Sequence, residues 1–434
     1  MEPRMLQLLL VLHVLALPVQ LCEIPKGKSP LIRCLNTELL RQSQDLLVEP
    51  NPSVYAALRL SADHSLEKEA RYLQRLKDVF LPSVSSSIAV DQQKQPSTGR
   101  LALYLLALRA ACQDMETRQG RKLVTQLKGH LHKEKTQIAF KGKGHPITSY
   151  YQYSLGVLAL CVHGKKLETD VIRQLLNAEK HNKFTHGGKL SVDTEAMVGL
   201  AFACLERANL YEPSTVAAIH TAGRRVTKKI LRAQTAKGTF GNVFSSPLAV
   251  QLLIATRMGT EPECTKVMAT LLESLEAFQN PMTMSQLLPV LYGKSYLDIA
   301  TMECQAENDT LELDTTCPGP GPLILGPEMI TVHLDVENSL RPEKLYNCSI
   351  QVPSGSSLLA VLKTAKQGSP GQFTFETQDT LQGLFLTSVM GVKAGDGEWK
   401  YWQLLQAPDT SLEKGISDYH PRDGETILLK FRTW

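Results

Sequence analysis

Three short segments of the chain place hydroxyl, amide and aromatic side chains directly before an apolar stretch. They read HPITSYYQY at 145–153, THGGKLSVDT at 185–194 and GTFGNVFSSP at 238–247. Neutral hydrogen-bond donors and acceptors with few charges suit a large, amide-rich ligand that a protein orients without attacking it. These loops therefore predict a binding surface if the fold brings them to one place.

Each of these side chains alone is most simply a helix cap. The repetition of the pattern in three loops makes ligand binding an equal alternative. If the loops meet at one end of the fold, they present one set of candidate residues. The set is Thr148, Ser149, Tyr150, Gln152, Asp193, Asn242 and Ser245.

An enzyme is the competing interpretation, because helical toroids often hold hydrolases. A glycoside hydrolase needs two carboxylates at a defined separation across a cleft. Asp193 and Glu195 are candidates, but they lie two residues apart and point in different directions, so capping or support of the helix by Asp193 is favoured. The chain contains no G-x-S-x-G, P-loop, H-E-x-x-H or thioester motif. A secreted glycoside hydrolase remains the alternative to a non-enzymatic binding protein.

The elements that position these loops follow a helical pattern from about residue 23 to 303. Apolar stretches with small residues alternate with amphipathic ones such as GRKLVTQLKGHLHKEK. This alternation predicts an inner and an outer ring of helices, an α6/α6 toroid, with an irregular helical solenoid as the alternative. The six apolar stretches, about 40 to 50 residues apart, are VYAALRLS at 54, RLALYLLALRAAC at 100, YYQYSLGVLALC at 150, VDTEAMVGLAFACL at 192, SPLAVQLLIA at 246 and SQLLPVL at 285.

The composition changes after Cys304. The segment 305–325 is acidic and then rich in proline and glycine, which is typical of a linker. Beyond it, ITVHLDVE, CSIQV, FTFETQ and ETILLKF alternate as strands do, and SGSSLLAVLKTAKQ predicts one helix. We expect a helical domain over 20–304 and, over 326–434, a small α/β domain similar to a β-grasp, with one mixed sheet and one helix.

The N-terminus predicts secretion. Arg4 precedes an apolar stretch from Leu6 to Leu17, which is too short to span a bilayer and is typical of a signal peptide over 1–19. No later segment reaches the roughly 18 uninterrupted apolar residues of a membrane helix. We therefore expect an extracellular protein of plasma without membrane insertion.

The cysteines, the sequons and the net charge further restrict the class of protein. Most of the nine cysteines are expected to pair in an oxidising compartment, and none has the spacing of a zinc site. The sequons at Asn308 and Asn347 predict a glycoprotein. The net charge of +4 and the scattered basic residues argue against a nucleic-acid partner.

The residues resemble a known family, the secreted cobalamin-binding proteins (transcobalamin, intrinsic factor and haptocorrin). The similarity covers nearly the whole chain after the predicted signal peptide, in order and spacing, and is strongest to the transcobalamins. The segments that carry it are CEIP at 22–25, LALYLLALRA at 101–110, HPITSYYQY, SVDTEAM, FGNVFSSPLA, SQLLPVL, LTSVMG at 386–391 and the ending DGETILLKFRTW.

The resemblance implies a monomeric carrier that holds one corrinoid between its two domains and delivers it through a transcobalamin-type cell-surface receptor. Cobalamin is then a transported ligand and not a catalytic cofactor. From the helical domain the implied contacts are Thr148, Ser149, Tyr150, Tyr151, Gln152, Asp193, Asn242, Ser245 and Gln286. From the small domain they are Ser388, Val389 and Met390, with Trp402 nearby.

The resemblance also implies three disulfides. They join Cys22 to Cys264, Cys112 to Cys304, and Cys161 to Cys204. The first would close the ring by linking its first and late segments, and the last would tie two neighbouring inner helices. It assigns no partner to Cys34, Cys317 or Cys348.

The chain departs from the family pattern at two positions. Arg100 stands where the family often has glutamine, so an amide contact would become a charged one. Leu190 stands where similar transcobalamins place a cobalt-coordinating histidine, directly before SVDT. The nearest histidines are His186 and His181, and the glycines at 187–188 would let His186 turn inward. Ligation of cobalt by His186 and binding without any histidine both stay open, since other family members lack this histidine.

Overall fold

The computed structural model describes most of the chain. The predicted signal peptide 1–19 lies outside the described residues, as does the predicted linker 305–325 apart from 307–311. The chain divides into two compact units, with the boundary between Thr315 and Thr316. The described residues are 22, 26–46, 48–80, 96–140, 144–186, 189–258, 261–304, 307–311, 329–339, 343–353, 355–368, 371–380, 383–395, 400–412, 414–417 and 419–433.

The helical unit is built around a ring of six apolar helices. Each packs on the next in chain order, and the last packs back on the first, so the ring is closed. These helices are apolar around nearly their whole circumference, which is the pattern of a fully buried helix. They are α3 (Pro52–Leu60), α5 (Thr98–Ala110), α7 (Tyr150–Val162), α9 (Val192–Ala208), α11 (Ser246–Thr256) and α13 (Pro281–Leu291).

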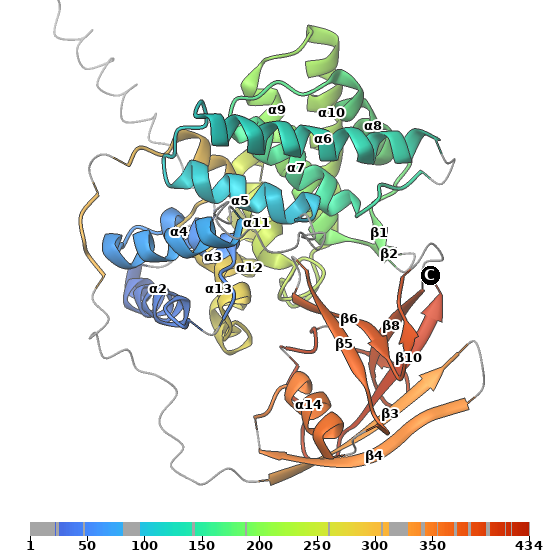
Figure 1. Ribbon diagram of the computed structural model, residues 1–434. Helices are drawn as coiled ribbons and strands as arrows, with labels where there is room; N and C mark the ends of the chain where they lie inside the picture. The colour runs from blue at the N-terminus through green and yellow to red at the C-terminus, as the bar shows by residue number, and fades with distance from the viewer. Residues whose placement is uncertain are drawn as a thin grey trace, which may run out of the picture. The chain divides into compact units, whose positions relative to one another are not determined.

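A second set of six helices covers this ring (Figure 1). Each precedes one inner helix in the chain and buries a single apolar stripe. The predicted α6/α6 toroid is therefore confirmed, with all six predicted apolar stretches in the inner ring. The outer helices are α2 (Ser29–Ser43), α4 (Leu66–Phe80), α6 (Arg118–Phe140), α8 (Thr169–Lys180), α10 (Pro213–Arg232) and α12 (Glu261–Glu273), and the short 3-10 turns are η1 (Lys26–Lys28), η2 (Leu275–Ala277) and η3 (Tyr296–Thr301).

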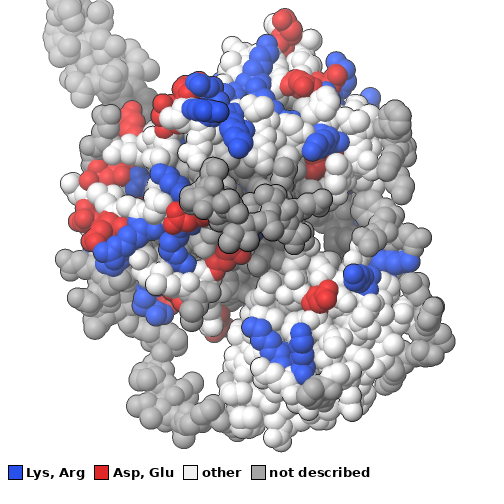
Figure 2. Space-filling view, in the orientation of Figure 1, with Lys and Arg blue, Asp and Glu red and all other residues white. Residues whose placement is uncertain are grey.

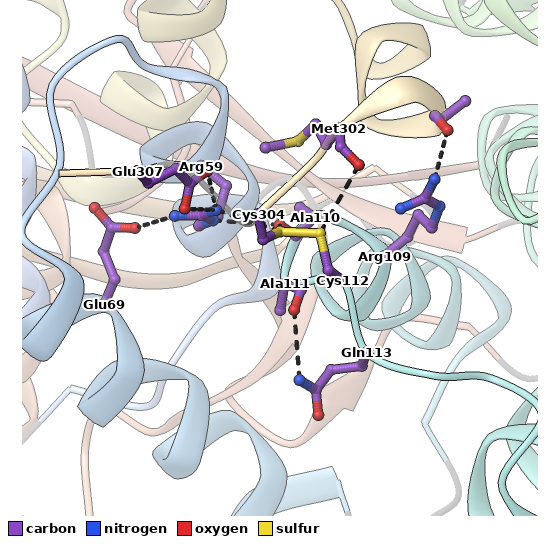
Figure 3. Close-up of a disulfide and its surroundings, with 11 residues drawn as sticks. Arg59, Glu69, Arg109, Ala110, Ala111, Cys112, Gln113, Met302, Cys304 and Glu307 are labelled. Atoms are coloured by element: carbon purple, nitrogen blue, oxygen red, sulfur yellow. Dashed lines mark hydrogen bonds and ion pairs between the residues drawn. A yellow bond between two sulfur atoms is a disulfide. The ribbon is translucent and has the colours of Figure 1, made fainter.

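The segment 307–311 belongs structurally to the helical unit. Glu307 accepts hydrogen bonds from the buried guanidinium of Arg59 at 2.5 and 2.6 Å, beside the Cys112–Cys304 disulfide (Figure 3). The backbone N–H groups of Thr310 and Leu311 donate to the His64 carbonyl, both at 2.9 Å. The first described part of the predicted linker is thus anchored on helix α3 and the turn before α4.

The small unit combines two antiparallel or mixed sheets with one helix. The larger sheet has the order β4-β3-β10-β8-β9, in which β3 and β10 are parallel, and the smaller has the order β5-β6-β7. Sequence patterning predicted a single sheet, but the FTFETQ strand pairs with β6 in the second one. The elements are β3 (Met329–Asn338), β4 (Glu343–Pro353), α14 (Leu358–Gly368), β5 (Phe375–Thr380), β6 (Gly383–Val389), β7 (Val392–Lys393), β8 (Lys400–Gln406), β9 (Thr410–Ser411) and β10 (Thr426–Thr433).

Candidate functional site

The first turns of the six inner helices form one end of the ring, which we call the rim. Inner helices separated by one outer helix run in the same direction, so all six begin at this end. Hydrogen bonds near the starts of these helices show the convergence. Ser53 Oγ of α3 lies 3.0 Å from Ser285 Oγ of α13, and Gln152 Oε1 of α7 accepts from the Gly99 N–H of α5 at 3.0 Å.

The loop before α7 is held by its own side chains. Ser149 is the N-cap of α7 and accepts from the Gln152 N–H at 3.1 Å. Tyr150 is buried, donates its hydroxyl to the Gly144 carbonyl at 2.7 Å, and packs edge-on against the Phe184 ring. Capping and packing therefore account for Ser149 and Tyr150, whereas Thr148 lies half-buried just outside the cap.

A buried carboxylate behind this loop was missed by the sequence analysis. Glu134 of α6 accepts hydrogen bonds from the hydroxyls of Thr98 and Thr148 and from the Thr148 N–H. A signal was present in the sequence, because Glu134 continues the apolar stripe of Leu127 and Leu131 on α6. An acidic residue on a buried stripe requires hydrogen-bond partners in the core.

Asp193 joins the first turns of α9 and α11. Its carboxylate accepts from the Ser245 hydroxyl at 2.9 Å. Burial raises the pKa of Asp193, and the hydrogen bond from Ser245 opposes this shift. Of the two roles expected for Asp193, capping of α9 is wrong, because Ser191 is the N-cap and accepts from the Thr194 N–H, and support of the helix is the role that the Ser245 contact fits. Asp193 instead braces two neighbouring inner helices at the rim.

The third loop is ordered by Asn242. Its side-chain oxygen accepts from the backbone N–H groups of Phe244 and Ser245, at 2.9 and 2.8 Å. Tyr151 of α7 is also at the rim, and burial raises its pKa well above the ordinary value, with smaller contributions from Tyr296 and Asp193. The Tyr151 phenol therefore stays protonated and keeps its hydrogen-bond donor.

The loop between α8 and α9 is a short hairpin of β1 (Thr185–His186) and β2 (Lys189–Leu190). Leu190 is 40% exposed, and Ile147 in the loop before α7 is 61% exposed. For His186 the backbone is described and the side chain lies outside the described residues. His181 lies at the end of α8, where its Nδ1 contacts the Asn177 carbonyl at 2.8 Å. The rim loops thus expose two large apolar side chains.

The remaining predicted residues of the helical unit differ in their surroundings. Arg100, in the first turn of α5, forms an ion pair with Glu49 and places its guanidinium over the Phe80 ring. Gln286 is half-buried in the second turn of α13. Arg100 is thus engaged by neighbours in its own unit.

In the small unit, the predicted residues surround the turn between β6 and β7. Met390 occupies the left-handed region with φ 51°, and Ser388 is buried. Val389 and Trp402 belong to the hydrophobic core, and the Trp402 Nε1–H donates to the Val392 carbonyl at 3.0 Å. Trp402 therefore supports this turn from inside the core.

The disulfides join Cys22 to Cys264, Cys112 to Cys304, and Cys161 to Cys204. These are the three pairs that the family resemblance implied. Cys161 and Cys204 connect the far ends of α7 and α9. Cys34 is also disulfide-bonded, Cys348 is a free thiol, and Cys317 lies outside the described residues.

Other possible sites are weaker. Glu195 is fully buried, so it cannot face Asp193 across a cleft as a glycosidase carboxylate must. A cavity of about 620 Å³ lies where α5 and α7 end, away from the rim, and its lining charges include the paired Lys165 and Glu116. Over the described parts of the chain, no three His, Cys, Asp or Glu side chains are grouped as metal ligands.

The surface charge and the length of the apolar helices test the expectations about nucleic-acid and membrane partners. Figure 2 shows acidic and basic side chains interspersed on the visible face of the helical unit, without a continuous basic stripe there. None of the helices within the described ranges is both long and apolar enough to cross a membrane.

Comparison with known proteins identifies relatives over both units. Residues 4–323 match the profile of the eukaryotic cobalamin-binding protein family, and 355–433 match a domain of unknown function, DUF4430. Transcobalamin-2 of Bos taurus is 46% identical over 442 residues, covering 98% of this chain and 99% of the bovine protein. Human transcobalamin-2 is 45% identical over 436 residues, covering 98% of each.

More distant relatives agree. The cobalamin binding intrinsic factor of Canis lupus familiaris is 32% identical over 424 residues, covering 94% of this chain and 93% of the dog protein. A crystal structure of haptocorrin in complex with Cbi has the same fold, with a TM-score of 0.71 at 23% identity, covering 95% of this chain and all of that one. These relatives confirm the prediction of a binding protein that is not an enzyme. Because the family profile spans most of the sequence and transcobalamin-2 aligns along nearly all of it, this chain belongs to the eukaryotic family of cobalamin-binding transport proteins.

Proposed function

We propose that the rim of the helical unit binds cobalamin as a transported ligand, without changing it chemically. The observation that carries the proposal is the combination of neutral hydroxyl and amide groups with the exposed side chains of Ile147 and Leu190. A corrin ring offers an apolar face and a periphery of amides, so it requires both kinds of contact.

We further propose that Ser388, Val389 and Met390 of the small unit contact the same corrinoid. The support is the sequence resemblance together with the left-handed turn at Met390, since constrained turns are typical of binding loops. Trp402 then acts indirectly, by fixing the turn between β6 and β7. Arg100 and Gln286 are proposed as outer contacts of the rim.

Secretion and delivery form a separate part of the proposal. Residues 1–19 act as a signal peptide, and a cell-surface receptor takes up the loaded protein, which circulates as a glycosylated monomer. Expression in mammalian cells tests this: the protein is expected in the medium without its first residues, and it should carry labelled cobalamin into receptor-bearing cells. Retention of the uncleaved chain inside the cells would contradict secretion.

Chromatography tests the binding function. Ligand-free protein mixed with excess cobalamin is expected to elute as a red protein with one corrinoid per chain, and its mass should correspond to a monomer. Elution of all the colour with the free cobalamin would refute the proposed function.

A further inference from the structure

The hydrogen bonds around Glu134 determine the direction in which the Thr148 hydroxyl donates. The Thr148 hydroxyl donates to Glu134 Oε1 at 2.7 Å, and the Thr148 N–H donates to Oε2 at 3.2 Å. The Thr98 hydroxyl donates to the same Oε1 at 3.0 Å. A carboxylate offers only acceptors, and a hydroxyl has a single proton. Thr148 therefore has only lone pairs left for any further partner.

The position of Glu134 makes this constraint strong. Glu134 is 2% exposed, and its carboxylate lies between the first turn of α5 and the loop before α7. Three hydrogen bonds from Thr98 and Thr148 converge on this carboxylate, and hydrogen bonds to a carboxylate acceptor are stronger than those between neutral groups. Turning the Thr148 proton outward would leave a buried acceptor without that donor, which is costly.

We propose that Glu134 is a positioning residue that makes Thr148 an obligate acceptor and so selects corrinoids whose neighbouring side chain is an intact amide. This inference rests on the proposed binding of cobalamin at the rim. An amide NH₂ donates to the free lone pairs of Thr148. A carboxylate at the same place on the ligand would set its lone pairs against those of the Thr148 oxygen, and neither group could donate. The corrinoid with an acid in place of that amide is therefore rejected.

A second hydroxyl at the rim also donates its proton to a carboxylate. Ser245 donates its hydroxyl to Asp193 at 2.9 Å, so its oxygen is also left with lone pairs. The first pair joins the loop before α7 to outer helix α6, and the second joins the starts of the inner helices α11 and α9. At these two positions the rim offers hydrogen-bond acceptors, so it favours ligand groups that donate hydrogen bonds.

The test compares cobalamin with its isomeric monocarboxylic acids, in each of which one side-chain amide is hydrolysed. The wild type is expected to bind at least one isomer about tenfold or more weaker than cobalamin. In Glu134→Gln, the new NH₂ donates to the Thr148 oxygen and releases the hydroxyl proton towards the ligand. The affinity ratio of amide to acid for that isomer should then fall towards one.

The affinity ratio of amide to acid distinguishes a positioning role of Glu134 from a purely structural one. A loosened loop would weaken the binding of both ligands alike and leave the ratio unchanged. Thr98→Val removes the other hydroxyl on Oε1 and should keep the wild-type ratio. If Glu134→Gln does not fold, Thr148→Val supplies the same readout, with a ratio near one expected. An unchanged ratio in these variants, or equal binding of all isomers by the wild type, overturns the inference. Absence of any cobalamin binding by the wild type refutes the proposed function itself.

Discussion

Asp193 and Ser245 are predicted to contact the ligand, and they also connect the first turns of α9 and α11. Burial raises the pKa of Asp193, while the Ser245 hydroxyl is the donor that favours its charged form. Binding and structure therefore depend on the same hydrogen bond. Substitutions at this pair are informative only when stability is measured beside affinity.

Asp193→Ala is expected to weaken cobalamin binding by roughly tenfold to a hundredfold, because it removes a hydrogen bond to a charged group. Calorimetric titration measures the loss. Glu67→Gln, an exposed carboxylate substitution on outer helix α4, is the matched control and should bind as the wild type does. Equal affinities of Asp193→Ala and wild type would remove Asp193 from the site.

His186 raises a question of axial coordination. Because Leu190 stands where the sequence resemblance implies a coordinating histidine, we predict that bound aquocobalamin keeps its exogenous axial ligand. The visible spectrum should then be the same for the wild type and His186→Ala. An imidazole-type shift that the variant loses would show that His186 ligates cobalt, and that shift should fade below about pH 6.5, because a protonated imidazole cannot bind metal.

At the scale of elements, ion pairs to two buried carboxylates connect α8, α9 and α10. Lys229 of α10 lies 3.3 Å from Glu179 of α8 and 3.2 Å from Glu195 of α9, and Arg225 also pairs with Glu179. Burial raises the pKa of Glu195 to about 7, Lys229 opposes the shift, and Glu179 adds to it. The two carboxylates share the ammonium group of Lys229, and Glu179 has Arg225 as a second cation. The negative charge of Glu195 is therefore less well compensated than that of Glu179.

This arrangement predicts that protonation of Glu195 in mild acid makes a stabilising contribution to the helical unit. A carboxyl whose folded-state pKa lies above its unfolded value of 4.5 binds its proton more tightly when folded. Its contribution is complete below about pH 4.5 and is lost as pH rises through about 7. Glu195→Gln should therefore exceed the wild type in unfolding free energy at pH 8, by at most about 3 kcal/mol, and match it near pH 4.5.

Denaturant unfolding at the two pH values measures the difference. The control is Glu179→Gln, which weakens ion pairs to both Arg225 and Lys229 and should destabilise at pH 8. A Glu195→Gln variant that is less stable than the wild type at pH 8 would show that its ion pair with Lys229 outweighs its burial.

The inner helices could be predicted from sequence because a helix buried on all sides is apolar throughout. The loops were also predictable as a group, since each places polar side chains just before such a helix. Glu134 could not be assigned as a rim residue, because its partners Thr98 and Thr148 lie on other elements. The second sheet was missed because alternation indicates a strand but not its pairing partner.

At the scale of the whole molecule, two units separated by a linker predict a change on binding. If both contact one corrinoid, the loaded protein should have a smaller hydrodynamic radius than the free protein. Binding only to the closed form also raises stability, by about 4 kcal/mol at a ligand concentration a thousandfold above Kd. Equal radii and equal melting temperatures with and without cobalamin would contradict the two-unit clamp.

The domain division was predictable from composition, but the end of the helical unit was not. Proline and glycine after residue 316 mark the linker, whereas 307–311 is acidic and polar yet anchored on the helical unit through Arg59. This contact joins residues 248 positions apart, so no local pattern could indicate it.

The central claim is that one corrinoid binds at the rim, and calorimetric titration of cobalamin into the ligand-free protein tests it most directly. The account predicts one site per chain in the wild type, with clearly weaker binding when Thr148 and Asp193 are both replaced by alanine and unchanged binding in Glu67→Gln. No heat of binding in the folded wild type, or equal affinity in the rim variant, would contradict it.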